Sequence, residues 1–251
     1  MSEVMLQQTQ VARVEPLFEA FLARFPTVVA LAAATRADVV RQWAGLGYHR
    51  RAVSLHEAAR AVVRDHRGRV PRAAATLRGL PGVGPYTAAA VASIAFGEPV
   101  AAMDVNVRRV IARSVYGADP DEVGSGLTEA AAQALLPPEQ PGAWNQALMD
   151  VGREACRPVP RCERCPLRSW CLYAAAGRSG GPTGPRQSPF EGSTRQARGR
   201  VVAALRGAGS VRIADLPTLI GVDAAGVDAA LAGLTRDGIA IAARGRVRFA
   251  E

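Results

Sequence analysis

The chain has 251 residues, of which 49% are hydrophobic, enough for one large or two to three small domains with a proper core. It carries 31 basic and 22 acidic residues, a net charge of +9, and arginine supplies the basic excess. Arginine suits bidentate phosphate contacts, so nucleic-acid binding would explain the positive charge. A high-GC genome that enriches arginine would explain it equally well. No stretch resembles a signal peptide or a membrane-spanning helix, which excludes a membrane-embedded chain and predicts a cytosolic one.

Helical patterns dominate the first 155 residues. Residues 3–25 carry apolar side chains at helical spacing, with a break expected at Pro16. Thr35 is predicted to cap a helix over 36–44, which Gly45 ends. The other expected helices span 50–65, 85–96, 105–116, 126–135 and 143–155, and no convincing strand precedes residue 175.

The last part of the chain has a different pattern. Residues 177–193 are rich in Gly, Pro and Ser, which predicts a linker. Helical patterns at 194–206, 212–219 and 224–237 precede two short β-like runs, 239–243 and 246–249. Three helices and a terminal hairpin predict a winged-helix-like module, and such modules bind either DNA or protein. We therefore expect an all-α fold divided into a core (1–155), a cysteine loop (156–176), a linker (177–193) and a winged-helix-like module (194–251).

A proline–glycine turn and one acid form the most informative pair in the chain. The run Leu80-Pro81-Gly82-Val83-Gly84 predicts a tight hairpin between helices, and the amides that open the next helix would face a DNA phosphate. Asp104 follows where another helix is expected to begin, a position that favours a capping carboxylate. The pair predicts a DNA clamp with a carboxylate beside it.

Four cysteines gather within a short segment: Cys156, Cys162, Cys165 and Cys171. In a reducing cytosol this density predicts a metal centre rather than disulfides. Four thiolates hold either zinc or an iron–sulfur cluster, and the spacing alone does not separate the two. The arginines interleaved with them would contact phosphate or offset the thiolate charge: Arg157, Arg161, Arg164 and Arg168.

Together these motifs resemble the helix-hairpin-helix DNA glycosylases that carry a 4Fe–4S cluster, and among them the A/G-specific adenine glycosylases. The resemblance rests on residues 2–10, 45–48, 80–87, 103–107 and 144–150 and on the cysteine run. The first motif is the most specific, because endonuclease III-like relatives do not carry Glu followed by Gln-Gln-Thr-Gln. The tail resembles the short form of these enzymes, which has a small module in place of a Nudix-like domain.

The resemblance implies a reaction and assigns residues to it. A glycosylase extrudes its target base from the duplex, and adenine leaves only after a ring nitrogen is protonated. By resemblance, Glu3 is the general acid at adenine N7, Asp104 stabilises the oxocarbenium-like sugar, and Tyr86 and Asn106 orient these groups. The four cysteines would hold a 4Fe–4S cluster. The implied substrate is double-stranded DNA with adenine opposite 8-oxoguanine or guanine, bound by a nucleoid-associated monomer.

The resemblance also assigns contacts to DNA. Gln7 would act as a wedge that fills the space of the flipped adenine, and Tyr48 would stack beside the opposing 8-oxoguanine. The remaining expected DNA contacts are Gln8, Thr9, Leu80, Gly82, Val83 and Gly84. Each of these residues alone has an ordinary structural interpretation, as a surface glutamine, a turn residue or a packed aromatic. Their joint placement in the motifs favours the functional one.

Departures from the family pattern keep two alternatives open. Tyr86 stands where the endonuclease III type has a Schiff-base lysine, which predicts a monofunctional glycosylase. A T/G-mismatch thymine glycosylase also carries Tyr at this position, but Glu3 and the Gln-Gln-Thr-Gln run disfavour it. The first cysteine interval has five residues where the family usually has six, and Met1 directly precedes a motif that relatives place after a further helix. These two features make a catalytically inactive, cluster-bearing DNA-binding protein the other alternative.

Overall fold

The computed structural model describes residues 1–181 and 189–251. Contacts between residues divide the chain into two compact units. The first unit contains Met1–Val70, Leu80–Gly82 and Gln187–Glu251, and the second contains Pro71–Gly79 and Val83–Arg186. These units follow contacts rather than chain order, so the linear division of the sequence into core, cysteine loop, linker and module stays a prediction. Residues 182–188 of the expected linker lie outside the described residues.

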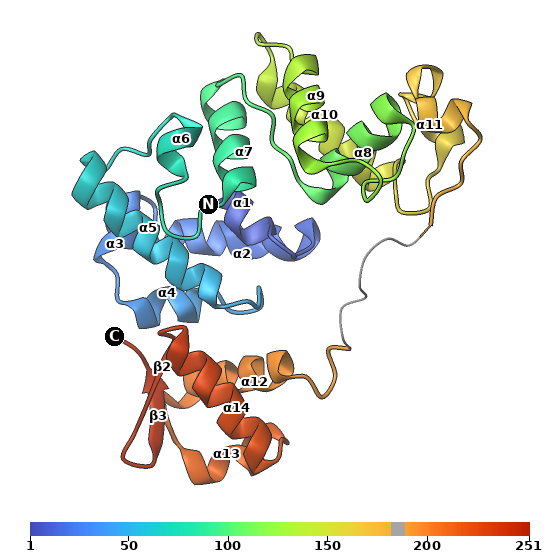
Figure 1. Ribbon diagram of the computed structural model, residues 1–251. Helices are drawn as coiled ribbons and strands as arrows, with labels where there is room; N and C mark the ends of the chain where they lie inside the picture. Colours follow the sequence, from blue (N-terminus) through green and yellow to red (C-terminus); the bar gives the residue numbers. More distant parts are fainter. Residues whose placement is uncertain (182–188) are drawn as a thin grey trace. The chain divides into compact units, whose positions relative to one another are not determined.

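The first unit begins with five helices, drawn in shades from blue to teal in Figure 1. They are α1 (Ser2–Leu6), α2 (Val11–Arg24), α3 (Val28–Ala33), α4 (Arg36–Gln42) and α5 (Arg50–His66). The break expected at Pro16 is wrong, because Pro16 lies inside α2. Pro16 and Ala12 are both exposed, so the carbonyl deprived of the proline N–H faces water. The helix is interrupted earlier, between residues 7 and 10, where Gln8 has a φ of 56°.

The C-terminal module completes the first unit and appears in orange and red in Figure 1. Its elements are α12 (Thr194–Ala208), β1 (Ser210–Arg212), α13 (Leu216–Ile220), α14 (Ala224–Arg236), β2 (Ala240–Ala243) and β3 (Arg246–Phe249). The strands form an antiparallel sheet in the order β1-β3-β2, with Val211 opposite Val247. The helix expected from residue 212 begins later, because Ser210–Arg212 pairs with β3 and buries Val211. The winged-helix-like arrangement of three helices and a hairpin is confirmed, with one more strand than expected.

The module and the N-terminal helices share one apolar core. Phe21 and Trp43 from the N-terminal helices and Leu205 and Leu234 from the module are fully buried in the same cluster. Polar contacts join the two parts as well: the Arg36 guanidinium donates to the Gly238 carbonyl (3.2 Å), and Arg41 lies over the ring of Phe249 at 5.2 Å. The module is therefore packed on the N-terminal helices as part of one unit.

The second unit is also helical. Its elements are α6 (Ala74–Leu77), α7 (Pro85–Phe96), α8 (Val105–Tyr116), α9 (Ser125–Leu135), α10 (Pro141–Glu154) and α11 (Leu172–Ala175), with 3-10 turns at Cys162–Arg164 and Arg168–Trp170. Helices α7 and α8 have the predicted bounds, and each ends at a glycine in the left-handed region, Gly97 and Gly117. The mostly helical fold expected from the sequence is confirmed.

Among the described residues, no single helix is long and apolar enough to cross a membrane. One pair, Ile213–Ile220 with Ala224–Arg236, passes that test on length and composition when the two are taken together, with a bend of 111°. Most of its large apolar side chains, Leu216 and Leu234 among them, are buried in the core of the first unit, whereas Leu219 is exposed.

The two glycines of the hairpin are glycine for different reasons. Gly82 has a φ of +74°, and a Cβ there would lie 2.5 Å from the Cβ of Ser54 in α5. Gly84 precedes α7 with a φ of −80°, and nothing lies within 4 Å of the position of its Cβ. Packing and backbone conformation therefore both require glycine at 82 and leave position 84 open.

We expect Gly82→Ala to lower the free energy of unfolding by about 2–3 kcal/mol, because the left-handed backbone and the contact with α5 both oppose a methyl group. Urea unfolding followed by circular dichroism measures the loss. Gly84→Ala is the matched control and should change stability by no more than about 0.5 kcal/mol. Equal losses in the two variants would contradict this account of the hairpin.

Candidate functional site

Asp104 is the N-cap of α8, as the sequence predicts. Its Oδ1 accepts hydrogen bonds from the backbone N–H groups of Asn106 (2.9 Å) and Val107 (2.6 Å). Its Oδ2 accepts from the side-chain amide of Asn106 at 2.9 Å. Three N–H donors therefore fix the orientation of a half-buried carboxylate at the positive end of a helix.

Asn106 connects this carboxylate to the start of the cysteine loop through Arg109. The Arg109 Nη2 donates to the Asn106 Oδ1 at 2.8 Å and to the Gly152 carbonyl at 2.9 Å, and its Nε donates to the Cys156 carbonyl at 2.6 Å. Gly152 brings α10 against Asn106, since a Cβ at 152 would lie 2.7 Å from the Asn106 Cβ. The acid and the first cysteine thus share one hydrogen-bond network.

Tyr86 lies in the first turn of α7, within the same unit as Asp104. Its hydroxyl donates to the sulfur of Met149 in α10 at 3.6 Å, and its ring packs against the small residues Ala89, Ala90 and Ala102. Packing of this kind fixes the ring while leaving the side chain half-exposed. The structure therefore places a phenol, rather than an amine, at this position.

The shortened first interval of the cysteine run is held by a buried arginine. Arg113 of α8 is 1% exposed and donates to the carbonyls of Arg157 (2.6 Å) and Pro158 (2.9 Å). It pairs with Asp119 at 2.7 Å and lies 4.7 Å from the ring centroid of Tyr173. Sequence reasoning passed over both Arg109 and Arg113. One feature of the sequence could have identified them: the two arginines are four residues apart, which places them on one face of a helix, beside the buried Val110.

All four cysteines line one small cavity with Arg113. They carry free thiols, and burial raises the pKa of the Cys156 and Cys162 thiols. Within the described residues, no three His, Cys, Asp or Glu side chains come together closely enough to hold a single metal ion. Four thiolates around one cavity could hold either tetrahedral zinc or an iron–sulfur cluster. The interleaved arginines at 157, 161, 164 and 168 are exposed around it.

The candidate general acid, Glu3, lies in the first unit, on α1. Met5 is fully buried and Val4 is 8% exposed, so the short helix is anchored in the core. Glu3 itself is half-buried. Burial lowers the pKa of the Met1 ammonium, and the negative charge of Glu3 acts in the opposite direction.

Arg51 of α5 holds the loop that carries the predicted DNA contacts Gln7, Gln8 and Thr9. Its Nη1 donates to the Val4 carbonyl (2.8 Å), the Met5 carbonyl (3.0 Å) and the Gln7 carbonyl. Its Nη2 donates to the Thr9 hydroxyl oxygen at 3.1 Å. One guanidinium therefore fixes the end of α1 and the turn that follows it.

The same guanidinium also holds the loop before α5. Its Nη2 donates to the carbonyls of Leu46 (3.0 Å) and Gly47 (3.4 Å). The group lies 5.4 Å from the ring centroid of Trp43 and 5.5 Å from that of Tyr48. Arg51 thus joins the two predicted DNA-contact loops, and sequence reasoning did not single it out.

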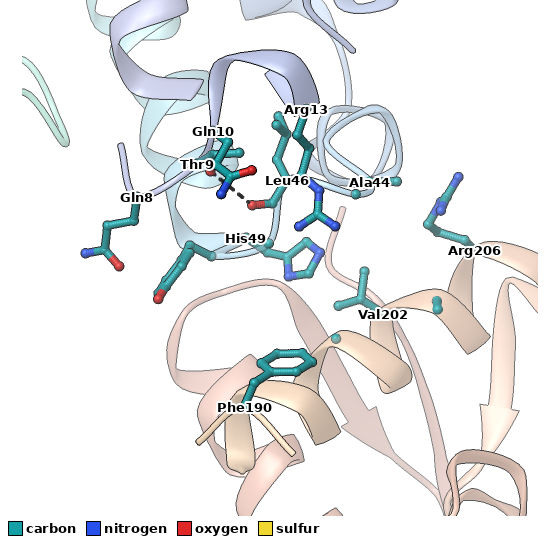
Figure 2. Close-up of a pocket in the computed structure, with 15 residues that line it drawn as sticks. Gln8, Thr9, Gln10, Arg13, Ala44, Leu46, His49, Phe190, Val202 and Arg206 are labelled. Atoms are coloured by element: carbon teal, nitrogen blue, oxygen red, sulfur yellow. Dashed lines mark hydrogen bonds between the residues drawn. The ribbon is translucent and has the colours of Figure 1, made fainter. Parts of the chain in front are cut away.

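Two of the predicted DNA contacts adopt left-handed backbone conformations although they are not glycine. Gln8 has a φ of 56° and Tyr48 a φ of 45°. Such conformations cost free energy and persist only where the surrounding structure imposes them, which the bonds of Arg51 do here. Both side chains are exposed, with Tyr48 at 41%. Figure 2 shows Gln8 and Thr9 on the wall of a cavity that Tyr48 also lines.

The predicted site residues divide between the two units. The first unit contains Glu3, Gln7, Gln8, Thr9, Tyr48, Leu80 and Gly82. The second contains Val83, Gly84, Tyr86, Asp104, Asn106, Cys156, Cys162, Cys165 and Cys171. Within each unit the structure brings together residues that are far apart in sequence.

These features define a helical DNA-repair glycosylase of the helix-hairpin-helix class. Residues 1–138 match the family described as HhH-GPD superfamily base excision DNA repair protein. The chain belongs to this family.

The relatives that it matches are adenine DNA glycosylases. The chain is 43% identical over 241 residues to the enzyme of Mycolicibacterium smegmatis, covering 95% of this chain and 82% of that protein. It is 42% identical to the Mycobacterium tuberculosis enzyme, covering 95% of this chain and 80% of that protein. Its match to the Homo sapiens enzyme, at 43% identity, covers 76% of this chain and 38% of that protein.

Solved structures show the same fold. A thermostable thymine-DNA glycosylase is 32% identical with a TM-score of 0.63, covering 69% of this chain and 82% of that one. A non-covalent endonuclease III–DNA complex is 25% identical with a TM-score of 0.60, covering 69% of this chain and 81% of that one.

We expect Arg51→Met to lower the free energy of unfolding by about 3 kcal/mol or more, because the carbonyls of two loops lose their donor. Hydrogen exchange should quicken at the amides of residues 7–10 and 45–48. Arg50→Met is the matched control: that side chain is 76% exposed and makes one ion pair at 3.7 Å. The control should cost no more than about 1 kcal/mol, and unchanged exchange in Arg51→Met would count against the assigned role.

Proposed function

We propose that the protein is a monofunctional glycosylase that removes adenine opposite 8-oxoguanine or guanine in double-stranded DNA. The observation that carries the proposal is a carboxylate fixed by three N–H donors, Asp104, in a chain 43% identical to an adenine DNA glycosylase over 95% of its length. Duplex DNA as the substrate is supported by the endonuclease III–DNA complexes among the similar structures.

Each carboxyl group has a distinct role in the proposed reaction. Glu3 donates a proton to N7 of the extruded adenine, so that the base can leave with the electron pair of the N-glycosidic bond. Asp104 faces the positive charge that develops on the sugar, and Asn106 and Arg109 hold its orientation. Water then adds to the sugar carbon, and Glu3 accepts the proton that this water releases. Tyr86 offers no amine for a Schiff base, so the chemistry ends with base removal.

The proposed DNA contacts come from three loops. Gln7, Gln8, Thr9 and Tyr48 lie on the two loops that Arg51 holds, with Gln7 as the wedge and Tyr48 beside the opposing base. Leu80, Gly82, Val83 and Gly84 form the hairpin before α7 and lie at the positive end of that helix, where a phosphate would bind. A monomer is sufficient for these contacts.

We also propose that Cys156, Cys162, Cys165 and Cys171 hold a 4Fe–4S cluster. The cavity that they share and the bonds from Arg113 that fix the short interval support the assignment. When bound, the cluster would tie the exposed loop around it into one structure and orient the exposed arginines of the loop. The network from Asp104 through Arg109 to the Cys156 carbonyl would make the site sensitive to loss of this loop.

A second candidate function is excision of thymine from T:G mispairs. It is favoured by the similarity to the thymine-DNA glycosylase structure. Glu3 and the Gln-Gln-Thr-Gln run favour adenine over thymine, because adenine needs a proton donor at a ring nitrogen before it leaves.

The catalytic roles are tested by single-turnover excision from A:8-oxoguanine, A:G, T:G and A:T duplexes. We expect adenine release from the first two, and a rate constant lowered about 10²–10⁴-fold in Glu3→Gln with duplex binding retained. Asp104→Asn should lose activity on the same scale, since an amide carries no negative charge. Glu19→Gln, an exposed acid on α2, is the control. Undiminished excision by Glu3→Gln would rule out its role, and thymine release alone would favour the second candidate.

The cluster is tested by visible absorption and by iron and sulfide analysis of protein purified without oxygen. We expect broad visible absorption, which zinc thiolates lack, and its loss in Cys162→Ser. Ser169→Ala, an exposed position in the same loop, is the control and should keep the absorption. A colourless protein that contains zinc would contradict the assignment.

A further inference from the structure

A continuous groove lies between the C-terminal module and the N-terminal helices of the first unit. It consists of two cavities of about 610 and 550 Å³ that share six lining residues: Gln8, Gly47, Tyr48, His49, Phe190 and Gly199. One wall comes from the loops that Arg51 holds, and the other from α12 and the residues before it. We call it the arginine groove. Figure 2 shows the first cavity, into which His49 and the ring of Phe190 point from opposite walls.

The charge of this groove is strongly positive. Six arginines line it: Arg13, Arg50, Arg51, Arg195, Arg198 and Arg206. Asp237 is the one acid among the described lining residues. The carboxylate of Asp237 already forms ion pairs with Arg198 and Arg50. Within the described part of the chain, the side chains of Arg13 and Arg206 have neither a hydrogen bond nor an ion pair, and both residues are exposed. The structure therefore leaves uncompensated guanidinium groups on both walls.

The pKa of His49 is lowered by burial and by the same positive charge. Burial first, and then the charges of Arg198, Arg51 and Arg206, lower its pKa from 6.5 to about 4, so the imidazole is neutral at neutral pH. Such a potential attracts an anionic ligand and gives up counterions when one binds.

The lining of the groove suits a nucleic-acid strand rather than a small ion. Its aromatic residues are open to solvent, with Tyr48 41% and Phe190 58% exposed, so stacking surfaces lie beside the cations. Gly199 lies on α12 where nothing is within 4 Å of the position of a Cβ. Packing does not require glycine there, and its lack of a side chain leaves the groove open along the helix.

We propose that the arginine groove binds the phosphate backbone of the DNA strand that passes Tyr48, with α12 as its second wall. The inference rests on the proposed function in one respect, that Tyr48 contacts DNA. It goes beyond that function because it gives the C-terminal module a direct role in DNA binding, in which Arg206 of the module and Arg13 of α2 hold one strand from both sides. The module thus extends the DNA-binding surface of the N-terminal helices.

The test measures the salt dependence of duplex binding by full-length protein, using an A:8-oxoguanine duplex and an undamaged duplex. Two lost phosphate contacts should reduce the slope of log K against log salt by about 1.8 in the double variant Arg13→Ala/Arg206→Ala. The loss should be similar on both duplexes, because phosphate contacts carry no sequence information. More protein should also be needed for half-maximal excision.

Two further variants make the result specific to the groove. Arg69→Ala/Arg236→Ala removes the same charge from exposed positions that do not line the groove, and should keep the wild-type slope. Gly199→Glu places a negative charge in the open groove, and should weaken binding without lowering the unfolding midpoint.

The outcomes separate this inference from the proposed function. A groove variant whose affinity and slope match those of the control overturns the inference, even when the wild-type protein excises adenine, and would indicate another occupant such as an acidic protein segment. A wild-type protein that binds duplex with the expected slope but releases no base overturns the proposed function and leaves the groove assignment supported. A wild-type protein that binds no duplex overturns both.

Discussion

The guanidinium of Arg51 donates hydrogen bonds to carbonyls at the end of α1 and in the irregular loop that follows it, and to carbonyls of the irregular loop before α5. Neither loop has a helix or strand ladder to satisfy its backbone, so a half-buried donor with a fixed fork of N–H groups takes that place. The position of Gln7, Gln8, Thr9 and Tyr48 depends on this one side chain. The left-handed conformations of Gln8 and Tyr48 persist because the same group bonds the carbonyl of the residue before each of them, Gln7 and Gly47.

In the second unit, Arg109 and Arg113 likewise donate hydrogen bonds to loop carbonyls. Arg109 links the Asn106 side chain to the Cys156 carbonyl, and Arg113 bonds the short loop between Cys156 and Cys162. Arginine is thus used in two ways in this protein. Buried arginines hold functional loops by their carbonyls, and exposed ones, such as Arg13 and Arg206, supply positive charge. A count of basic residues does not separate the two uses, and Arg51 serves in both, because it also lines the arginine groove.

The C-terminal module illustrates how a local prediction differs from a structural role. Its helices and hairpin were predictable from apolar spacing and from the two short β-like runs, and the structure confirms them. The short strand β1 was not, because three residues become a strand only when β3 lies beside them to accept their hydrogen bonds. The packing of the module on the N-terminal helices, through Leu205, Leu234 and Phe21, joins parts of the chain that are far apart in sequence and has no local signal.

The sequence by itself determined the family, the bounds of α7 and α8, the cap at Asp104 and the set of four cysteines, because these depend on local spacing and on residue types at fixed offsets. It failed at Pro16, where exposure of the freed carbonyl lets a helix continue through a proline. Only the tertiary structure decided which arginines are buried against loop carbonyls and which line a groove. Those roles depend on which residues each side chain contacts in the folded protein. Contacts between segments distant in sequence produce no periodic pattern in the sequence itself.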